Sequence, residues 1–326
     1  MFPETRLRRL RQRRLQPLFR ESELRATDLV APLFIDETLR EPLPISSMPG
    51  QSRIPLHGIA AVARRLYDAG IRAVILFGIP EKKDPSASSA FDADGVTQNA
   101  ARLIRSAVPG MVIMTDVCAC EYTDHGHCGI ITEERDGPDL DNDSSLTLMA
   151  KIAVSHAEAG ADCVAPSCML DGQVKTIRAA LDEKNFQKTP ILSYSTKFSS
   201  ALYGPFREAA DSCYSCGDRT TYQMDPANAR EAFRESKLDS EEGADILMVK
   251  PAGLYLDILK EIRTLGLPVA AYQVSGEYAM IKSAAMNGWI DEKNVVLESL
   301  TCIKRAGADL IITYFAEDAA RWLHEK

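Results

Sequence analysis

The 326 residues of the chain are enough for two small domains or for one large one. Apolar residues make up 45% and charged residues 26%, which is typical of a folded globular chain and excludes a disordered, collagen-like or low-complexity protein. The net charge of −8 argues against a general nucleic-acid binder, and no apolar run approaches the roughly 20 residues that a membrane helix needs. Eight unevenly spaced cysteines are too few for a disulfide scaffold, so we expect thiol or metal chemistry in the reducing cytoplasm.

Residues 1–28 differ from the rest of the chain in charge. Residues 1–20 hold one acid, Glu4, and seven arginines: Arg6, Arg8, Arg9, Arg11, Arg13, Arg14 and Arg20. The other 306 residues hold 31 basic and 45 acidic side chains. Leucines interleaved with the arginines interrupt the apolar core that a secretory signal requires. We expect a basic N-terminal arm that docks on the acidic surface of a sister subunit; a nucleic-acid-binding tail is the alternative.

Eight short apolar runs, each suited to a buried strand, recur along the chain. They span residues 29–35, 73–78, 111–117, 163–167, 191–195, 246–250, 269–275 and 310–315. Amphipathic stretches with helical spacing lie between them, at residues 59–69, 146–159, 227–242 and 294–306. These four stretches are each followed by a glycine and then by the next apolar run, which is the repeating unit of a parallel α/β fold.

Eight such units favour a closed (β/α)8 barrel, the TIM barrel, over an open doubly wound sheet. A nucleotide-binding open sheet would carry GxGxxG after an early strand, and the sequence has none. We therefore predict one catalytic domain over residues 29–326, preceded by the arm. In such a barrel the catalytic residues lie at the carboxyl ends of the strands.

Two of the predicted strands lead into lysine. The run at 191–195 continues through Thr196 to Lys197, and the run at 246–250 ends in Lys250. Burial among apolar neighbours and a second ammonium group nearby both disfavour the charged form, so we expect a lowered pKa for both lysines. The resulting neutral amine can attack a ketone to form a Schiff base. A solvated strand end is the ordinary interpretation of one such lysine. For two on consecutive strands, an active site and two solvated strand ends are equal alternatives.

The loop after the third predicted strand reads DVCACEYTDHGHCG and contains Cys118, Cys120 and Cys128. Glycines in this loop let the backbone fold back, so that three thiols can surround one zinc ion. Three protein ligands leave a fourth position for water or substrate, as in catalytic zinc sites. His125 or His127 could instead close a structural Cys3His site. Free structural cysteines are a further alternative, because the spacing is not that of a standard zinc finger.

A long polar segment, residues 198–223, separates two predicted strands. Such segments often cover an active site, so we call this one the lid. Its Arg207, Arg219 and Gln223 can grip a carboxylate in bidentate fashion, although loop arginines are also often solvated. Ser275 and Tyr314, at the ends of the last two predicted strands, offer hydroxyl groups for a second carboxylate.

Taken together, these segments closely resemble the porphobilinogen synthase (5-aminolevulinate dehydratase) family. The resemblance spans the chain and is carried by AVILFG, MTDVCACEYTDHGHCG, VAPSCMLDG, SYSTKFSSALYGPFR, GDRTTYQMDP, MVKPAGLYLD, YQVSGEYAM and LIITYF. It implies a (β/α)8 barrel with an N-terminal arm. It also implies a lyase reaction that condenses two molecules of 5-aminolevulinate to porphobilinogen, with loss of two waters, in tetrapyrrole biosynthesis.

The resemblance also implies roles for individual residues. Lys250 is expected to form the Schiff base with the substrate that becomes the propionate side, and Lys197 with the one that becomes the acetate side. Zinc on the three cysteines, with Asp116 and Ser167 beside it, serves the acetate side, whose carboxylate Arg207, Arg219 and Gln223 hold. Ser275 and Tyr314 are expected to hold the propionate-side carboxylate. Phe77 and Phe206 are expected to pack against that substrate and keep water from its imine, and Tyr203 is expected to bind substrate.

Two expectations concern assembly and a second metal. Some members of the family bind an activating magnesium through a glutamate that matches Glu235, although a helical glutamate is often only solvated. The resemblance further implies a homo-octamer built from arm-exchanging dimers. The sequence departs from the family's usual pattern at Cys213 and Cys216 in the lid, which could bind a second metal, close as a disulfide, or remain inert thiols.

Two other functions compete with this interpretation. A class I aldolase on the same barrel would account for one lysine, but not for the second lysine or the cysteine loop. A zinc-containing nucleic-acid-binding protein would account for the basic arm and the cysteines, and its DNA binding should fall steeply with added salt.

Overall fold

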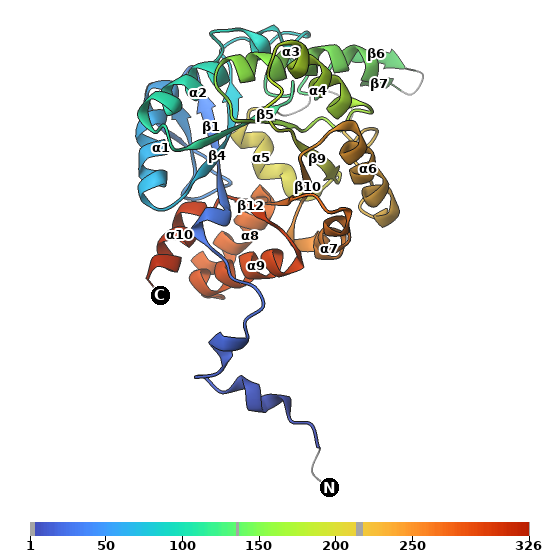
Figure 1. The fold of residues 1–326 in the computed structure, drawn as a ribbon. Helices are drawn as coiled ribbons and strands as arrows, with labels where there is room; N and C mark the ends of the chain where they lie inside the picture. Colours follow the sequence, from blue (N-terminus) through green and yellow to red (C-terminus); the bar gives the residue numbers. More distant parts are fainter. Residues whose placement is uncertain (1–3, 135–136, 213–217, 326) are drawn as a thin grey trace.

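A barrel of eight parallel strands forms the centre of the molecule in this computed structural model, which describes residues 4–134, 137–212 and 218–325 (Figure 1). The strands are β1 (Leu29–Asp36), β4 (Ala73–Ile79), β5 (Val112–Val117), β8 (Cys163–Pro166), β9 (Leu192–Lys197), β10 (Ile246–Lys250), β11 (Val269–Gln273) and β12 (Leu310–Thr313). Their order is β8-β5-β4-β1-β12-β11-β10-β9, and the two ends meet where Val164 pairs in parallel with Ile191. The predicted (β/α)8 barrel is thus confirmed.

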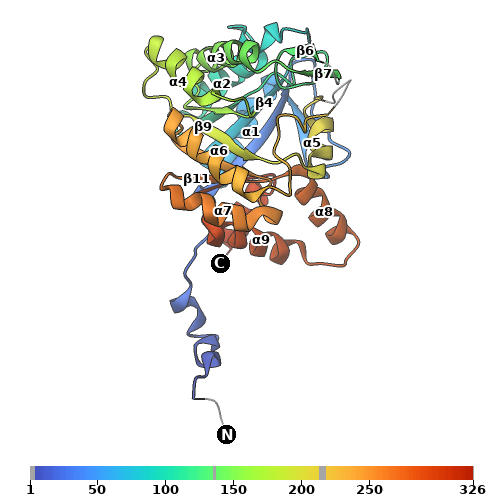
Figure 2. The ribbon, with the colours of Figure 1, turned by 90° about the vertical axis from the view of Figure 1, so that its right-hand side faces the viewer.

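Helices surround this barrel and cover its outer face (Figures 1 and 2). They are α1 (Ile59–Asp68), α2 (Val96–Ala107), α3 (Asn142–Glu158), α4 (Gln173–Glu183), α5 (Gly204–Ala209), α6 (Ala229–Glu242), α7 (Leu256–Ile262), α8 (Ser275–Met286), α9 (Glu292–Ala306) and α10 (Ala316–His324). Short 3-10 helices are η1 (Leu7–Arg11), η2 (Gln16–Phe19), η3 (Ala26–Asp28), η4 (Leu56–Gly58), η5 (Ser88–Phe91), η6 (Ala201–Tyr203), η7 (Gly253–Tyr255) and η8 (Arg263–Leu265).

Local sequence signals explain where these helices begin and end. The Asp141 carboxylate accepts the backbone N–H of Ser144 and caps α3, and Asp291 caps α9 in the same way through Asn294. Helix α6 ends at Gly243, whose φ of +107° is open to glycine and disfavoured for other residues. The strands are mostly buried on both faces, as the parallel barrel requires, and β1 is buried along its whole length.

The structure departs from the predicted elements at several strand ends and in four short strands. Strand β12, for example, ends at Thr313, whereas the predicted run continues to residue 315. The apolar run at 269–275 predicts strand throughout, but β11 ends at Gln273 and Ser275 begins α8. The cause is the Glu277 carboxylate, which accepts the backbone N–H of Val274 at 2.7 Å and caps the helix. The sequence does not predict the short strands β2 (Leu43–Pro44), β3 (Ser52–Pro55), β6 (Ile131–Glu134) and β7 (Gly137–Leu140), because two to four residues are too few for an alternating pattern.

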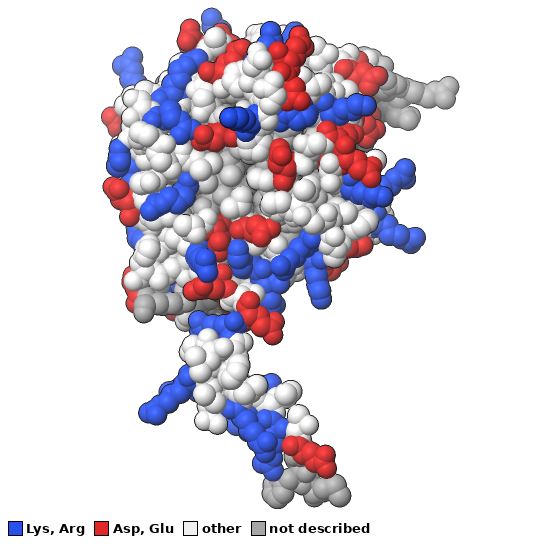
Figure 3. Space-filling model, viewed as in Figure 1, with Lys and Arg blue, Asp and Glu red and all other residues white. Residues whose placement is uncertain are grey.

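The N-terminal segment extends away from the barrel as an open arm (Figures 1 and 2). Its large apolar side chains are unburied: Leu7, Leu10, Leu18 and Phe19 are 67%, 50%, 73% and 54% exposed. Figure 3 shows basic side chains along the arm and charges of both signs over the barrel. Within the described part of the chain, none of the helices has the length and apolar character that crossing a membrane requires.

Candidate active site

Lys197 and Lys250 lie side by side at the carboxyl ends of adjacent strands. They are register partners in the pairing of β9 with β10, and each is only 5% exposed. Their Nζ atoms lie 5.7 Å and 5.0 Å from the centroid of one ring, that of Tyr194. The two amines therefore lie close together in one buried region at the barrel mouth, shielded from bulk solvent, and this region is called the pocket below.

Aromatic rings surround Lys250. Its Nζ lies 4.4 Å from the ring centroid of Tyr272, 5.0 Å from that of Phe206 and 5.3 Å from that of Tyr203. Burial lowers the pKa of Lys250 to about 7, and the positive charge of Lys197 adds to this effect, while the Asp116 carboxylate opposes it. A substantial fraction of this amine is therefore neutral, and nucleophilic, near neutral pH.

Lys197 has different surroundings. Its Nζ donates a hydrogen bond to the backbone oxygen of Ser167 at 2.6 Å. Burial lowers the pKa of Lys197, but negative charge at the cysteine cluster, chiefly on the Cys128 sulfur, outweighs burial, so that the pKa is raised overall. The prediction that both lysines have a lowered pKa is therefore wrong for Lys197. Sequence spacing does not reveal that the cysteine loop folds back onto this amine.

Asp116 lies close to both lysines. Its Oδ2 accepts a hydrogen bond from the Ser167 hydroxyl at 3.1 Å, and its buried Oδ1 has no partner among the described residues. Burial raises the pKa of Asp116 to about 7, and the negative charge of Glu121 raises it further, whereas the two lysines oppose the shift. Asp116 can therefore both accept and donate a proton near neutral pH.

Cys118, Cys120 and Cys128 form a buried cluster beside Lys197. Their sulfurs lie within 4.8 Å of one another, and those of Cys118 and Cys120 are 3.3 Å apart. Zinc bound to thiolates at about 2.3 Å in tetrahedral geometry places sulfurs roughly 3.8 Å apart, so the three residues fit such an ion. The thiols of Cys118 and Cys120 hold the pKa of Cys128 well below its usual range, which favours the ligating thiolate.

Neither histidine of the loop belongs to this set of candidate ligands among the described residues. The Nδ1 of His127 lies 3.2 Å from the hydroxyl of Tyr222, and the backbone N–H of His127 donates to Nδ1 of His125. The geometry therefore favours three thiol ligands with an open position over a closed Cys3His site.

Sequence reasoning missed two buried neighbours of the cluster. The Cys168 thiol donates to the backbone oxygen of Cys128 at 3.0 Å, and the Cys120 thiol donates to the Glu121 carboxylate at 3.2 Å. Glu121 also groups with Asp116 and Cys118 as a second set of candidate ligand atoms. The sequence does hold one signal for these two residues, because each directly follows a predicted site residue: Cys168 follows Ser167, and Glu121 follows Cys120.

The lid presents buried donors. Arg219 is 7% exposed, and its Nη2 donates to the backbone oxygens of Gly126 at 2.8 Å and Ser212 at 3.2 Å. Its Nε and the Nε2 of Gln223 are buried with no hydrogen-bond partner among the described residues. Unsatisfied buried donors are costly, so these atoms are available for a bound carboxylate. Arg207 lies on the short lid helix α5, so the lid carries both of the predicted arginines.

Ser275 and Tyr314 lie near the aromatic side of the pocket. The Ser275 hydroxyl accepts the backbone N–H of Phe206 at 2.9 Å, and the Tyr314 hydroxyl lies 3.1 Å from that of Tyr272. The ring of Phe206 meets that of Phe77 edge-on at 5.2 Å. Ser275 thus joins the lid helix to the barrel, and the rings make this side of the pocket apolar.

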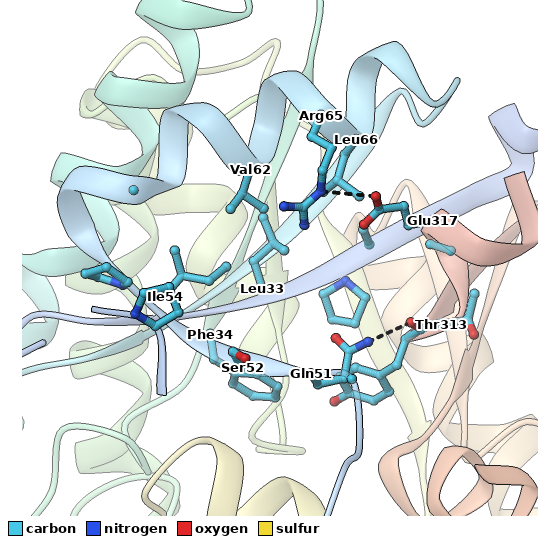
Figure 4. A pocket seen from close by; sticks show the side chains of 18 residues that line it. Leu33, Phe34, Gln51, Ser52, Ile54, Val62, Arg65, Leu66, Thr313 and Glu317 are labelled. Carbon is cyan, nitrogen blue, oxygen red and sulfur yellow. Dashed lines mark hydrogen bonds and ion pairs between the residues drawn. The ribbon is translucent and has the colours of Figure 1, made fainter. Parts of the chain in front are cut away.

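A cavity of about 240 Å³ is lined by residues of β1, α1 and α10 and by Tyr314. Figure 4 shows Leu33, Val62 and Glu317 among the side chains that line it. Arg65 and Glu317 form an ion pair of 3.0 Å at one side of this cavity. The Gln51 side chain donates to the backbone oxygen of Tyr314 at 3.1 Å. Neither the lysines nor the cysteine cluster line this cavity, so it is separate from the candidate site.

Glu235 lies apart from the lysines, in an acidic cavity of about 420 Å³ that also includes Asp171, Glu231 and lid residues. Burial raises the pKa of Glu235 to about 7, and the neighbouring acids Asp171 and Glu242 contribute. Glu235 belongs to no three-ligand group within the described ranges. Cys213 and Cys216 lie outside the described residues.

A closed barrel with buried amines and thiols gathered at the carboxyl edge defines a TIM-barrel enzyme. The profile of the family described as Delta-aminolevulinic acid dehydratase matches residues 4–322, so the chain belongs to this family. The delta-aminolevulinic acid dehydratases of Archaeoglobus fulgidus and Escherichia coli are each 53% identical to it, covering 99% and 96% of both chains. A crystal structure of the Toxoplasma gondii enzyme with the reaction product porphobilinogen is 42% identical, with a TM-score of 0.96 over 99% of this chain and 92% of that one.

Proposed function

We propose that this enzyme condenses two molecules of 5-aminolevulinate to porphobilinogen with loss of two waters, a hydro-lyase step of tetrapyrrole (haem and chlorophyll) biosynthesis. The observation that carries the proposal is the pair of buried lysines on adjacent strands, Lys197 and Lys250, facing one pocket. The family's name and the product in the Toxoplasma gondii structure support the choice of substrate.

Lys250 begins the reaction on the propionate side. Its neutral amine attacks the keto carbon of one substrate, and the carbonyl oxygen leaves as water after protonation, which yields an imine. The low pKa of Lys250, about 7, supplies this neutral amine. The rings of Phe206, Tyr203 and Phe77 keep water from the imine, while Ser275 and Tyr314 bind the propionate-side carboxylate.

Lys197 serves the acetate side and must first lose a proton. Asp116, with a pKa of about 7 and a position among the lysines, is the group that accepts it. Once neutral, the amine attacks the second keto group in the same way. Ser167 orients both partners, because its backbone oxygen holds Lys197 and its hydroxyl holds Asp116.

The three thiols would hold zinc as the metal cofactor, and when bound this ion would act as a Lewis acid on the second substrate or activate a water. The sulfur spacing and the burial of Cys118, Cys120 and Cys128 support that assignment. Arg207, Arg219 and Gln223 bind the acetate-side carboxylate, and the unpartnered donors of Arg219 and Gln223 support this role.

Borohydride reduction in the presence of 5-aminolevulinate tests the proposal, because it converts a lysine imine into a stable adduct. Peptide mapping should find adducts on Lys250 and Lys197, and no adduct without substrate. The exposed Lys260 of α7 is the internal control and should stay unmodified. A class I aldolase would trap a single lysine with a different keto substrate, and trapping at neither lysine would contradict the proposal.

Assembly and location are further parts of the proposal. The four exposed apolar side chains of the arm need a surface to cover them, which supports arm exchange in a homo-octamer built from dimers. Residues 1–28 then form the arm and residues 29–326 the catalytic domain, with a lid at about 198–223. Deletion of residues 2–20 should yield smaller particles in light scattering; unchanged octamers would contradict arm exchange.

The remaining assignments are cytoplasmic location, no nucleic-acid partner, and a magnesium ion at Glu235. The acidic cavity around Glu235 supports the magnesium assignment. Activation by magnesium should be lost in Glu235→Gln if the assignment is correct. Binding of duplex DNA that falls steeply with salt would favour the nucleic-acid alternative instead.

A further inference from the structure

Strand β9 contains a β-bulge just before Lys197. The pairing with β10 matches Ser193 with Leu247 and Thr196 with Val249. Between these two pairs β9 has two residues, whereas β10 has one, and an extra residue in one of two paired strands defines a bulge. The rest of β9 resumes regular pairing, with Lys197 opposite Lys250.

The side chains of β9 show what the bulge does. In a regular strand successive side chains face opposite sides of the sheet. Tyr194 faces the barrel interior, where its ring lies near both lysine amines. Ser195 and Thr196, although consecutive, both contact α6 outside the barrel, and Lys197 faces inward again.

If the same β9 sequence formed a regular strand without the bulge, the side chains after Tyr194 would face the opposite sides of the sheet. A regular strand that places Tyr194 inside the barrel also places Thr196 inside and Lys197 outside. The amine of Lys197 would then lie among the surrounding helices, away from Ser167 and Lys250. The bulge is therefore the local feature that directs Lys197 into the pocket.

One side chain of α6 holds both outward-facing residues of the bulge. The hydroxyl of Ser236 lies 3.0 Å from that of Ser195 and 2.8 Å from that of Thr196. Ser236, Ser195 and Thr196 are all at most 1% exposed, so water does not replace these hydrogen bonds. Thr196 has a second, longer contact with the backbone oxygen of Ala232 at 3.4 Å. Helix α6 lies along β9, as Figure 2 shows.

We propose that Ser236 is a positioning residue for Lys197: its hydroxyl pins the β9 bulge and thereby keeps the Lys197 amine in the pocket beside Lys250. This inference rests on the role proposed for Lys197. Ser236 touches neither lysine, and it acts only through Ser195 and Thr196. Lys250 lies on the unbulged strand, so this anchor does not fix the direction of its side chain.

The test is lysine-specific trapping in Ser236→Ala. Trapping with 5-aminolevulinate and borohydride is done at a pH well above 7, where the Lys250 amine is neutral whether or not the Lys197 charge is nearby. The adduct on Lys197 should fall at least tenfold relative to the unaltered protein, while the adduct on Lys250 should stay within twofold. Thr196→Val, which removes one of the two outward hydroxyls and preserves shape, should lower the Lys197 adduct in the same direction by less. Ser236→Thr retains the hydroxyl and should restore most of the Lys197 adduct.

Ser193→Ala is the matched control, because the Ser193 hydroxyl donates to Asp239 across the same β9–α6 contact but precedes the bulge. It should leave the ratio of the two adducts unchanged. A parallel fall at both lysines in Ser236→Ala, or an unchanged ratio, would overturn the positioning role. Absence of any adduct in the unaltered protein would instead contradict the proposed function. A crystal structure of Ser236→Ala would then decide the positioning role, which is overturned if Lys197 still faces the barrel interior.

Discussion

The two lysines occupy matching positions on neighbouring strands, yet their surroundings change their proton affinity in opposite directions. Lys250 faces aromatic rings, and burial lowers its pKa to about 7. Lys197 faces the cysteine cluster, and negative charge there, chiefly on the Cys128 sulfur, raises its pKa despite burial. Identical residues on one sheet edge therefore differ in reactivity because of what the loops bring to each of them. The aromatic side is prepared for attack, whereas the sulfur side requires a base or a bound cation first.

Removal of the aromatic-side amine should have the largest effect. Lys250→Met eliminates the neutral nucleophile, so kcat should fall by at least about 10³-fold, as expected when a group that forms a covalent intermediate is lost. Steady-state assay of porphobilinogen formation measures this change. Lys260→Met, an exposed lysine of α7, serves as the control and should retain full activity. Residual activity within tenfold would show that Lys250 is not the nucleophile.

The next largest effect should follow the loss of one thiol from the cysteine cluster beside Lys197, the sulfur side of the site. Cys128→Ser removes the sulfur whose pKa is held lowest, so bound zinc should drop below one ion per chain and activity should fall on the order of 10²-fold. Elemental analysis and activity are measured on the same samples. The matched control Cys302→Ser, on α9, should have the same zinc content and the same activity as the unaltered protein. Full zinc content in Cys128→Ser would contradict a three-thiol site.

The lid arginine of the sulfur side should affect binding more than chemistry. Arg219→Lys keeps the charge but loses the planar fork, including the unpartnered Nε, so KM should rise about tenfold with a smaller change in kcat. Arg230→Lys, at an exposed position of α6, is the control. An unchanged KM would remove Arg219 from the carboxylate site.

Electrostatic coupling between the two sides should have the smallest effect. The positive charge of Lys197 lowers the pKa of Lys250, so Lys197→Met should move the Lys250 midpoint upward from about 7. Less of the Lys250 amine is then neutral at pH 7, and its imine formation should slow there while recovering at higher pH. The pH profile of Lys250 trapping measures this shift. A midpoint that stays in place or falls would show that the two amines are not coupled.

Much of the fold could be predicted because the strands and helices of the barrel follow local patterns of apolar and polar residues in the sequence. Eight apolar runs separated by amphipathic stretches identify the strands, and a lysine at the end of a strand identifies the edge that carries chemistry. Glu277 shows the limit of such patterns. Its carboxylate caps α8 and shortens the strand that the apolar run suggested, which is a competition between two local signals.

The parts that escaped prediction depend on contacts between distant segments. The raised pKa of Lys197 comes from sulfurs about 70 residues earlier in the chain, and the bulge that directs this lysine inward is held by Ser236, about 40 residues later. Cys168 and Glu121 were missed because a buried thiol or carboxylate has no periodic signature. Their neighbours Ser167 and Cys120 were identified only through their place in longer motifs.

Site-resolved proton affinity of the two amines tests the central contrast most directly. Metal-free protein is treated with a trace of acetic anhydride over a range of pH, and acetylation of each lysine is quantified by peptide mapping. Lys250 should become reactive with a midpoint near 7, and Lys197 only above the ordinary lysine range. Equal midpoints, or a lower midpoint for Lys197 than for Lys250, would contradict the assignment of one aromatic and one sulfur-facing amine.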